Sequence, residues 1–453
     1  MVCRFKRRFP IESSTWSWTG FDKTGNYYFD LAVYGAEQDQ AMQRYGLFEV
    51  LGIEVEYMLV DRETLGIRPD VGRILQRDGS PVDELTFQGT AWSNELVSHV
   101  LELKTEPPVK DVASAFTLLR RDLENVIPGL RSDGYTLLGT GMHPFMRPQE
   151  TVLWPGENGP IYQAFDRIFD CSGHGWSNLQ SMHLNFPFKD DYEFERLMAA
   201  IRLIIPLLPA LSASSPICEG SWTGFHDYRL EVYRKNAARV PSVSGRVVPE
   251  PIFDPAEYEQ RVLGRIYEDL KPLDPEGILR EEWVNARGAI ARFDRNAIEI
   301  RVIDTQECLS MDMAIACIVN EALKGLVEER WSDHSSQMAM DQEILVDTFL
   351  SVIRNGGTVE LDDRYRRVLG LKNQQTVESA WKEMCERLHF SSEQNLDRSV
   401  EFLLARGSLS RRIKTFLETK ANTILTSVPV SVENHLLPLY ERMDSPLQQP
   451  FLP

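Results

Sequence analysis

Cysteine, phosphate-binding glycine loops and long apolar runs are all scarce in this chain. Its six cysteines are scattered over 453 residues without a Cys-x-x-Cys pair, which argues against a zinc ribbon and is typical of free thiols in a reducing compartment. No Gly-x-x-x-x-Gly-Lys-Ser/Thr segment is present, which argues against a P-loop nucleotide site. The most apolar segment, residues 203–211, is too short to cross a bilayer and contains two prolines. Residues 1–8 are basic but lack the apolar part of a secretory signal, so we expect a cytoplasmic protein with no membrane partner.

Positive charge is scarce as well. The chain has 49 Lys and Arg residues against 67 Asp and Glu residues, a formal net charge of -18. Such a balance argues against nucleic acid as a partner, because phosphate backbones bind basic surfaces. The acidity serves solubility, or part of it forms a cluster of metal-binding carboxylates. The length allows one large catalytic domain with an extension, or two to three domains.

Four short segments combine an apolar face and a polar face at the spacing of a β-strand. They are residues 51–58, 100–104, 182–186 and 298–302. Side chains at i and i+2 share one face of a strand. The pairs that share a polar face are therefore Glu54 with Glu56, His183 with Asn185, and Glu299 with Arg301. A sheet that is apolar on one face and carries Glu, His and Arg on the other could hold divalent metal and phosphate, which suggests an enzyme that uses ATP.

The polar residues have the chemistry that such a site needs. Magnesium prefers oxygen ligands, and manganese behaves similarly but tolerates imidazole. Two ions bridging ATP phosphates would need several carboxylates in one cavity. The candidate ligands are Glu54, Glu56, Glu95, Glu102, His183 and Glu299. Glu95 and Glu102 could enter from a loop and from the strand that follows it, and the planar fork of Arg301 suits a phosphoryl group.

Each pattern also has a plain structural explanation. A Glu-x-Glu pair commonly marks the solvated face of a strand, and a lone histidine such as His183 is commonly structural. Glu299 and Arg301 could belong to a surface ion-pair network. Only the recurrence of the same residue types on several strands favours a site, because periodicity does not show that the strands converge.

The chain divides into three segments by composition. We expect an N-terminal extension over 1–45 with an aromatic hairpin, a catalytic domain over 46–333 and a helical C-terminal extension over 334–453. Asp111 is a plausible N-cap for a helix that runs to about Ile127 and that a Pro-Gly pair then ends. Helical spacing recurs at 191–212, 257–271, 310–332, 338–354, 374–389 and 396–420.

Seven stretches, weak singly but specific in order and spacing, carry a family resemblance. They are 51–57 (Leu-Gly-Ile-Glu-Val-Glu-Tyr), 95–105, 139–145 (Gly-Thr-Gly-Met-His-Pro-Phe), 181–185 (Ser-Met-His-Leu-Asn), 212–216 (Ser-Ala-Ser-Ser-Pro), Thr223-Gly224 with Tyr228-Arg229, and 299–304 (Glu-Ile-Arg-Val-Ile-Asp). Over roughly residues 48–330, the chain resembles glutamate–cysteine ligase family 2, a group of carboxylate–amine ligases related to glutamine synthetase.

The resemblance implies an α+β fold, with a glutamine-synthetase-like curved antiparallel sheet around ATP and Mg²⁺ or Mn²⁺. It implies that one metal is held by Glu54, His183 and Glu299 near the nucleotide, and another by Glu56, Glu95 and Glu102 near the activated carboxylate. It further implies that Arg301 stabilises the phosphoryl group in transfer and that Arg229 binds a substrate carboxylate. Arg292 and Arg295 lie just before the Glu299 strand and could also meet phosphate, or could be surface charges on a loop. Family members often carry a second histidine where this chain has Asn185, which could still hydrogen-bond the nucleotide.

These features lead to three functional hypotheses. The first is an ATP-dependent ligase that activates a carboxylate, plausibly the γ-carboxylate of glutamate, and joins it to an amine. The second is a phosphotransferase on the same fold, and the third is a non-catalytic nucleotide- or amino-acid-binding protein. We expect small-molecule substrates, and homo-oligomerisation stays open. His143 is expected to be structural, while His226 and Asp227 could line the substrate site.

Overall fold

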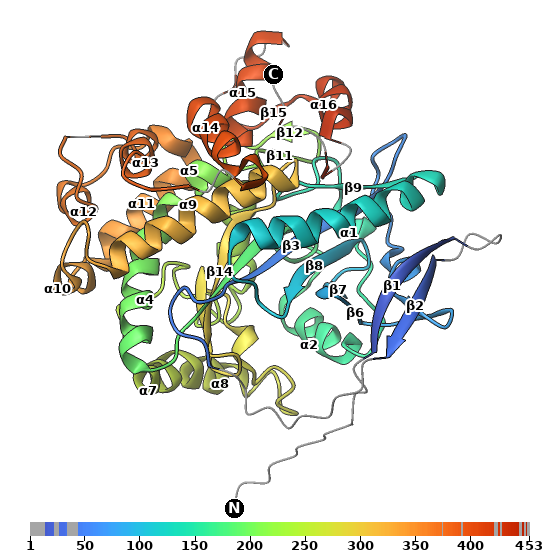
Figure 1. Cartoon of the computed structure of the whole chain (residues 1–453), viewed down its shortest axis with the longest axis horizontal. Helices are drawn as coiled ribbons and strands as arrows, with labels where there is room; N and C mark the ends of the chain where they lie inside the picture. The colour runs from blue at the N-terminus through green and yellow to red at the C-terminus, as the bar shows by residue number, and fades with distance from the viewer. Residues whose placement is uncertain are drawn as a thin grey trace, which may run out of the picture.

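The computed structural model describes residues 14–21, 27–33, 44–373, 375–390, 393–420, 425, 428–443, 446–447 and 450. Its centre is a ten-stranded sheet (Figure 1). In spatial order the strands are β13 (Ala289–Arg292), β14 (Ala297–Asp304), β10 (Ser181–Pro187), β3 (Gly52–Asp61), β8 (Val100–Glu106), β7 (Gly89–Asn94), β6 (Glu84–Phe87), β1 (Ser14–Phe21) and β2 (Tyr27–Val33), with β9 (Tyr135–Leu138) also paired to β3. Every pair is antiparallel except β1 with β6. The predicted α+β fold with a large antiparallel sheet is confirmed.

Three long helices form the core layer on the apolar side of the sheet; two contact its strands, and the third packs on those two. They are α1 (Val112–Ser132), α4 (Asp191–Ile204) and α9 (Leu309–Val327). On β3, Ile53, Val55 and Tyr57 are fully buried in this core, while the alternate side chains face the other way. The strand alternation read from the sequence therefore separates a core face from a polar face.

Shorter elements cover the polar face or connect the layers. They are α2 (Gly159–Phe169), α3 (His174–Ser177), α5 (Pro209–Ser212), α6 (Tyr228–Asn236), α7 (Pro255–Tyr258), α8 (Gly264–Leu270) and the 3₁₀ turn η5 (Glu282–Val284). Two small sheets join β11 (Ile217–Cys218), β12 (Ser221–Trp222) and β15 (Val430–Ser431), and β4 (Gln76–Arg77) with β5 (Ser80–Pro81).

Helix α1 begins as predicted but ends later. The Asp111 side chain accepts a hydrogen bond from the Ser114 backbone N–H at 2.8 Å, as an N-cap should. The helix then continues through Pro128 to Ser132, so the predicted end at the Pro-Gly pair is wrong. A proline costs a helix one backbone hydrogen bond. Leu130, 2% exposed, continues the buried stripe beyond it, and this burial offsets the loss.

The C-terminal segment is helical, as expected, and packs closely on the rest of the chain. Its helices are α10 (His334–Met338), α11 (Gln342–Asn355), α12 (Asp363–Val368), α13 (Val377–Cys385), α14 (Leu396–Arg406), α15 (Leu409–Lys420) and α16 (Glu433–Tyr440). Helix α14 lies along α9, and the Trp381 indole of α13 donates a hydrogen bond to the Leu207 carbonyl at 3.0 Å. The proposed boundaries near residues 46 and 334 stay predictions.

Three smaller expectations can be compared with the described residues. Strands β1 and β2 form the predicted N-terminal hairpin, at the edge of the large sheet. Five cysteines are buried free thiols, while Cys3 lies outside the described residues. In the part of the chain that the structure describes, no helix has both the length and the apolar character needed to cross a bilayer.

Candidate active site

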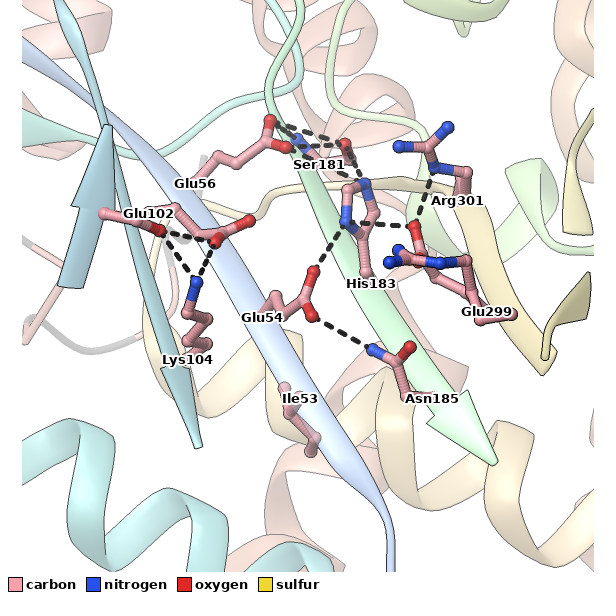
Figure 2. Close-up of polar contacts among 12 residues, drawn as sticks. Ile53, Glu54, Glu56, Glu102, Lys104, Ser181, His183, Asn185, Glu299 and Arg301 are labelled. Atoms are coloured by element: carbon pink, nitrogen blue, oxygen red, sulfur yellow. Dashed lines mark hydrogen bonds and ion pairs between the residues drawn. The ribbon is translucent and has the colours of Figure 1, made fainter. Parts of the chain in front are cut away.

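The pairing of four strands brings the predicted site residues together. His183 on β10 lies opposite Glu54 on β3, and Glu56 on β3 lies opposite Glu102 on β8. On the other side of β10, Asn185 lies opposite Glu299 of β14. Side chains paired across strands share one face of the sheet. Residues far apart in the sequence therefore point toward one another above the polar face (Figure 2).

This polar face is the floor of a cavity of about 440 Å³. Every predicted site residue lines it except Asn185, which lies beside Glu54. The predicted residues in its lining are Glu54, Glu56, Glu95, Glu102, His183, Arg229, Arg292, Arg295, Glu299 and Arg301. The elements α2, α3, α6 and η5 add aromatic side chains to the wall, namely Tyr162, Phe165, Trp176, Tyr233 and Trp283.

His183 lies between three carboxylates. Its Nδ1 donates a hydrogen bond to Glu54 Oε2 at 3.1 Å and lies 3.8 Å from Glu299 Oε1. Its Nε2 lies 2.9 Å from the Ser181 hydroxyl and 3.7 Å from Glu56 Oε1. Burial lowers the pKa of the imidazole. The hydrogen bond to Glu54 and the surrounding negative charge raise it by more, so the net pKa is raised.

At one end of the floor, cationic and amide groups balance the carboxylates. Glu54 Oε1 lies 3.2 Å from the Asn185 amide nitrogen and 3.4 Å from Arg295 Nη1. Glu299 lies 3.0 Å from Arg292 Nη1 and 2.8 Å from Arg301 Nε. Burial raises the pKa of Glu54, but the hydrogen bond and charge of the histidine and the charge of Arg295 outweigh it, so the net pKa is lowered.

At the other end, carboxylates crowd together with less compensation. Glu56, Glu95 and Glu102 each place an oxygen within 4.8 Å of the others. Glu95 follows β7 in a loop and Glu102 lies on β8, as the sequence suggested. Burial raises the pKa of Glu56, with a contribution from Glu102, and burial with both neighbouring carboxylates holds the pKa of Glu95 well above its usual range. Such a set of oxygen donors fits a hard divalent cation.

A second group of potential ligand atoms adjoins the first. Glu54, Glu102 and His183 also lie within 4.8 Å of one another, so Glu102 belongs to both groups. The resemblance had implied Glu299 in this set; its carboxylate lies 3.8 Å from His183 Nδ1 and is also held between Arg292 and Arg301. Carboxylate oxygens with one imidazole suit Mg²⁺ or Mn²⁺. The assignment of individual metal ligands stays a prediction.

Arg229 and Arg301 meet at the wall between α6 and β14. Arg229 Nε pairs with the buried carboxylate of Asp304, and its Nη1 and Nη2 each lie 3.4 Å from the Arg301 carbonyl oxygen. Arg301 Nη1 donates to the Asn285 carbonyl at 3.2 Å. Both arginines line the cavity, so each could contact an anionic substrate.

Two histidines lie outside this cavity. His143 is structural, as predicted: its Nδ1 accepts from two backbone N–H groups and its Nε2 donates to the Leu65 carbonyl at 2.7 Å. The suggestion that His226 and Asp227 line the substrate site is wrong for this cavity. Both residues lie just before helix α6: the His226 ring forms a hydrogen bond with the Ser410 hydroxyl at 3.1 Å, and Asp227 caps the helix by accepting from the Leu230 backbone N–H.

Several residues that line the cavity were not predicted from the sequence. Lys104 lies between Glu84 and Glu102, with its Nζ at 2.7 and 3.3 Å from their oxygens. Ser181 donates its backbone N–H to Glu56 at 2.7 Å. Each lies two residues from a predicted ligand on the same strand, so strand alternation alone would have found them. Tyr162 and Tyr233 carried no such signal, because they come from helices that fold over the sheet.

Comparisons with known proteins agree with this geometry. The sequence model described as "Glutamate-cysteine ligase family 2 (GCS2)" matches residues 50–410, which confirms the resemblance and extends it into the C-terminal helices. An uncharacterised protein of Archaeoglobus fulgidus is 35% identical over 308 residues, covering 68% of this chain and 80% of that protein. A Bradyrhizobium diazoefficiens protein named "Putative glutamate–cysteine ligase 2" is 27% identical over 281 residues, and the match spans 58% of this chain and 56% of that protein.

Two solved structures share the fold. A glutamate–cysteine ligase from Francisella tularensis in complex with AMP has a TM-score of 0.52 and 13% identity, covering 88% of this chain and 89% of that chain. A bifunctional glutathione synthetase from Pasteurella multocida has a TM-score of 0.51 and 12% identity, covering 88% and 53%. At these identities the likeness is one of fold alone.

Proposed function

The chain belongs to glutamate–cysteine ligase family 2, and on that premise we propose that it activates the γ-carboxylate of glutamate with ATP and joins it to an amine. Its family makes it an ATP-dependent carboxylate–amine ligase. The observation that carries the proposal is the pair of adjoining ligand groups on one cavity floor, which share Glu102. Two divalent cations held close together can neutralise the negative charge of a phosphoryl transfer between two anions.

The reaction has two displacements. A γ-carboxylate oxygen of glutamate attacks the γ-phosphorus of ATP, the bond to the β,γ-bridging oxygen breaks, and ADP leaves. The amine nitrogen then attacks the carbonyl carbon of the acyl phosphate, phosphate leaves, and the nitrogen loses a proton. Neither step needs a covalent nucleophile from the protein. The task of the protein is to hold two anions together in the correct orientation.

The charges that line the cavity match this task. Seven carboxyl groups line it, against five Lys and Arg side chains and His183, so the lining has no excess of positive charge to offset ATP and a second anion. Divalent cations held by Glu54, Glu102 and His183, and by Glu56, Glu95 and Glu102, would supply the missing positive charge and polarise phosphate and carboxylate oxygens.

Three arginines mark the end of the cavity that suits phosphate. Arg292, Arg295 and Arg301 all come from β13, β14 and the turn between them, next to Glu299. Guanidinium forks bind phosphoryl oxygens with parallel hydrogen bonds and keep their charge at all working pH values. We therefore assign the transferred phosphoryl group to this end, with Arg301 nearest to it. Glutamate then occupies the end with Glu95 and Arg229.

Phosphate release from Mg²⁺-ATP tests the proposal. Glutamate is supplied with ammonia or with each amino acid as the amine, and products are identified by mass spectrometry. Release that requires both glutamate and one amine, together with a joined product, is the expected result. A phosphoryl group left on the substrate, or ATP binding without turnover for any pair, would contradict it.

Two variants tie the activity to this cavity. Glu54→Gln and Glu299→Gln are expected to abolish turnover while the circular dichroism spectrum stays that of the folded protein, because each removes a charge from the cavity floor and keeps the side-chain volume. Full activity in either variant would show that this cavity is not where the reaction takes place.

A further inference from the structure

Four of the sequence motifs meet at one buried carboxylate, that of Asp304. These motifs are residues 139–145, 212–216, 228–229 and 299–304, and only the last two contribute residues to the chemistry above. Asp304 ends β14, is 0% exposed and does not line the cavity. A fully buried charge is costly unless it is paired, so its partners indicate what it is for.

The first oxygen of this carboxylate is bound by backbone and hydroxyl groups. Asp304 Oδ2 accepts from the Ser214 backbone N–H at 2.8 Å, from the Ser215 hydroxyl at 2.7 Å and from the Ser214 hydroxyl at 3.3 Å. Gly141 closes the remaining side, since a Cβ there would lie 2.3 Å from the carboxylate carbon. The carboxylate is therefore held from several sides, with its other oxygen directed at one group.

That group is the Arg229 guanidinium, whose Nε pairs with Asp304 Oδ1. Asp227 also lies nearby, but burial and the charge of Asp304 hold the pKa of Asp227 well above its usual range. Asp304 is thus the carboxylate that balances Arg229.

A guanidinium fixed through Nε presents its outer nitrogens in one direction. Arg229 is 1% exposed and still lines the cavity, so these nitrogens lie at the cavity wall. The Arg301 carbonyl lies 3.4 Å from both of them, at the long end of hydrogen-bond distances, which leaves donors available for a ligand. A planar pair of N–H donors matches the two oxygens of a carboxylate.

We propose that Asp304 is a positioning residue, which holds Arg229 so that its outer edge binds the carboxylate substrate. This inference rests on the proposed function and adds to it the role of the Gly-Thr-Gly and Ser-Ala-Ser-Ser motifs, which build the Asp304 pocket. The alternative is a purely structural ion pair. The chain contains one for comparison: Arg412 and Glu307 pair at 2.6 Å with 2% and 0% of their side chains exposed, and neither lines the cavity.

Asp304→Asn separates these two roles, because an amide cannot accept hydrogen bonds at the positions of both carboxylate oxygens. Both oxygens accept from N–H groups, so the amide NH₂ must face either Ser214 or Arg229. Gly141→Ala displaces the same carboxylate without changing its charge. In phosphate-release assays we expect both variants to raise the KM for glutamate about ten- to hundredfold, with the KM for ATP changed less than about twofold.

Glu307→Gln is the matched control, since it removes one charge from an equally buried pair outside the cavity. We expect it to lower thermal stability and to leave both KM values unchanged. An unchanged glutamate KM in Asp304→Asn and Gly141→Ala would overturn the inference. The same rise in Glu307→Gln would overturn it too, because general loosening would then explain the effect.

Crystal structures of the variants keep this test independent of the proposed function. If the wild-type protein shows no turnover with any glutamate–amine pair, the proposed function fails. The positioning role is then decided by the Arg229 side chain in Asp304→Asn. A guanidinium displaced from the cavity wall supports the inference, and one that stays in place overturns it.

Discussion

The two ends of the cavity floor have the same kinds of ligand and opposite electrostatics. At one end, Glu54 and Glu299 are matched by His183 and by arginines, and the pKa of Glu54 is lowered. At the other end, Glu56, Glu95 and Glu102 crowd together, and the pKa values of Glu56 and Glu95 are raised by burial and mutual repulsion.

The difference shows that the ends depend unequally on bound cations. The balanced end keeps its geometry through its own ion pairs, because each carboxylate has a cationic partner. At the crowded end Lys104 pairs with Glu102, but the raised pKa values of Glu56 and Glu95 show that these two carboxyls favour a bound proton unless a cation is present. We expect cation binding to order and stabilise the crowded end more than the balanced end.

The largest expected effect is on stability without metal. Glu299→Gln leaves Arg292 and Arg301 short of a buried partner, so we expect the free energy of unfolding to fall by about 3 kcal/mol. Glu95→Gln removes a repelled charge and should raise it by about 1 kcal/mol. Urea unfolding in EDTA measures both. Changes of the same sign would show that the two ends are not electrostatically different.

The two ends are expected to change the free energy of unfolding with pH in opposite directions. Each unit of pKa shift corresponds to about 1.4 kcal/mol. Glu95 has a folded pKa above its ordinary 4.5, so the folded protein holds more protons than the unfolded chain above pH 4.5, and stability falls as pH rises through that window. Glu54 has a lowered pKa, so its contribution is present above 4.5 and is lost as pH falls below it.

Urea unfolding in EDTA from about pH 3 to pH 8 measures this dependence. Glu95→Gln should flatten the profile above pH 4.5, and Glu54→Gln should flatten it below. Saturating Mg²⁺ should abolish the fall above pH 4.5 in the wild-type protein. A profile that neither variant changes would contradict the assignment.

The smallest expected effect comes from removing one uncharged hydrogen-bond donor at each end. Asn185→Ala removes the 3.2 Å bond to Glu54 and should raise the KM for ATP a few-fold, a change of about 1 kcal/mol. Ser93→Ala removes the 2.7 Å bond to Glu102 and should act on the KM for glutamate instead. Steady-state kinetics with each substrate varied in turn compares them. Equal effects of both variants on both KM values would show that the ends do not bind separate substrates.

Much of the floor could be predicted because strand alternation is a local property. The spacing of Glu54 and Glu56, or of Glu299 and Arg301, shows which face each side chain occupies once a strand is assumed. The N-cap at Asp111 was equally local. The helix end at Pro128 was wrong because the cost of a proline is local, whereas the burial that outweighs it comes from the packed core.

The convergence of the site could not be read in this way. The sequence does not show that Glu56 and Glu102 lie opposite each other, because strand register depends on the pairing of distant segments. His226 and Asp227 were misplaced for the same reason, because the partner of His226, Ser410, comes from a distant segment and Asp227 is used to cap helix α6.

The sequence by itself determined the alternating strands, the types of ligand they carry and the family, because each of these is written in short stretches of residues. Only the tertiary structure decided that Glu102 belongs to both ligand groups, that Glu299 is held by two arginines, and that Asp304 holds Arg229. These are contacts between segments far apart in the chain, and their distances and charges exist only after the strands have paired and the core has closed.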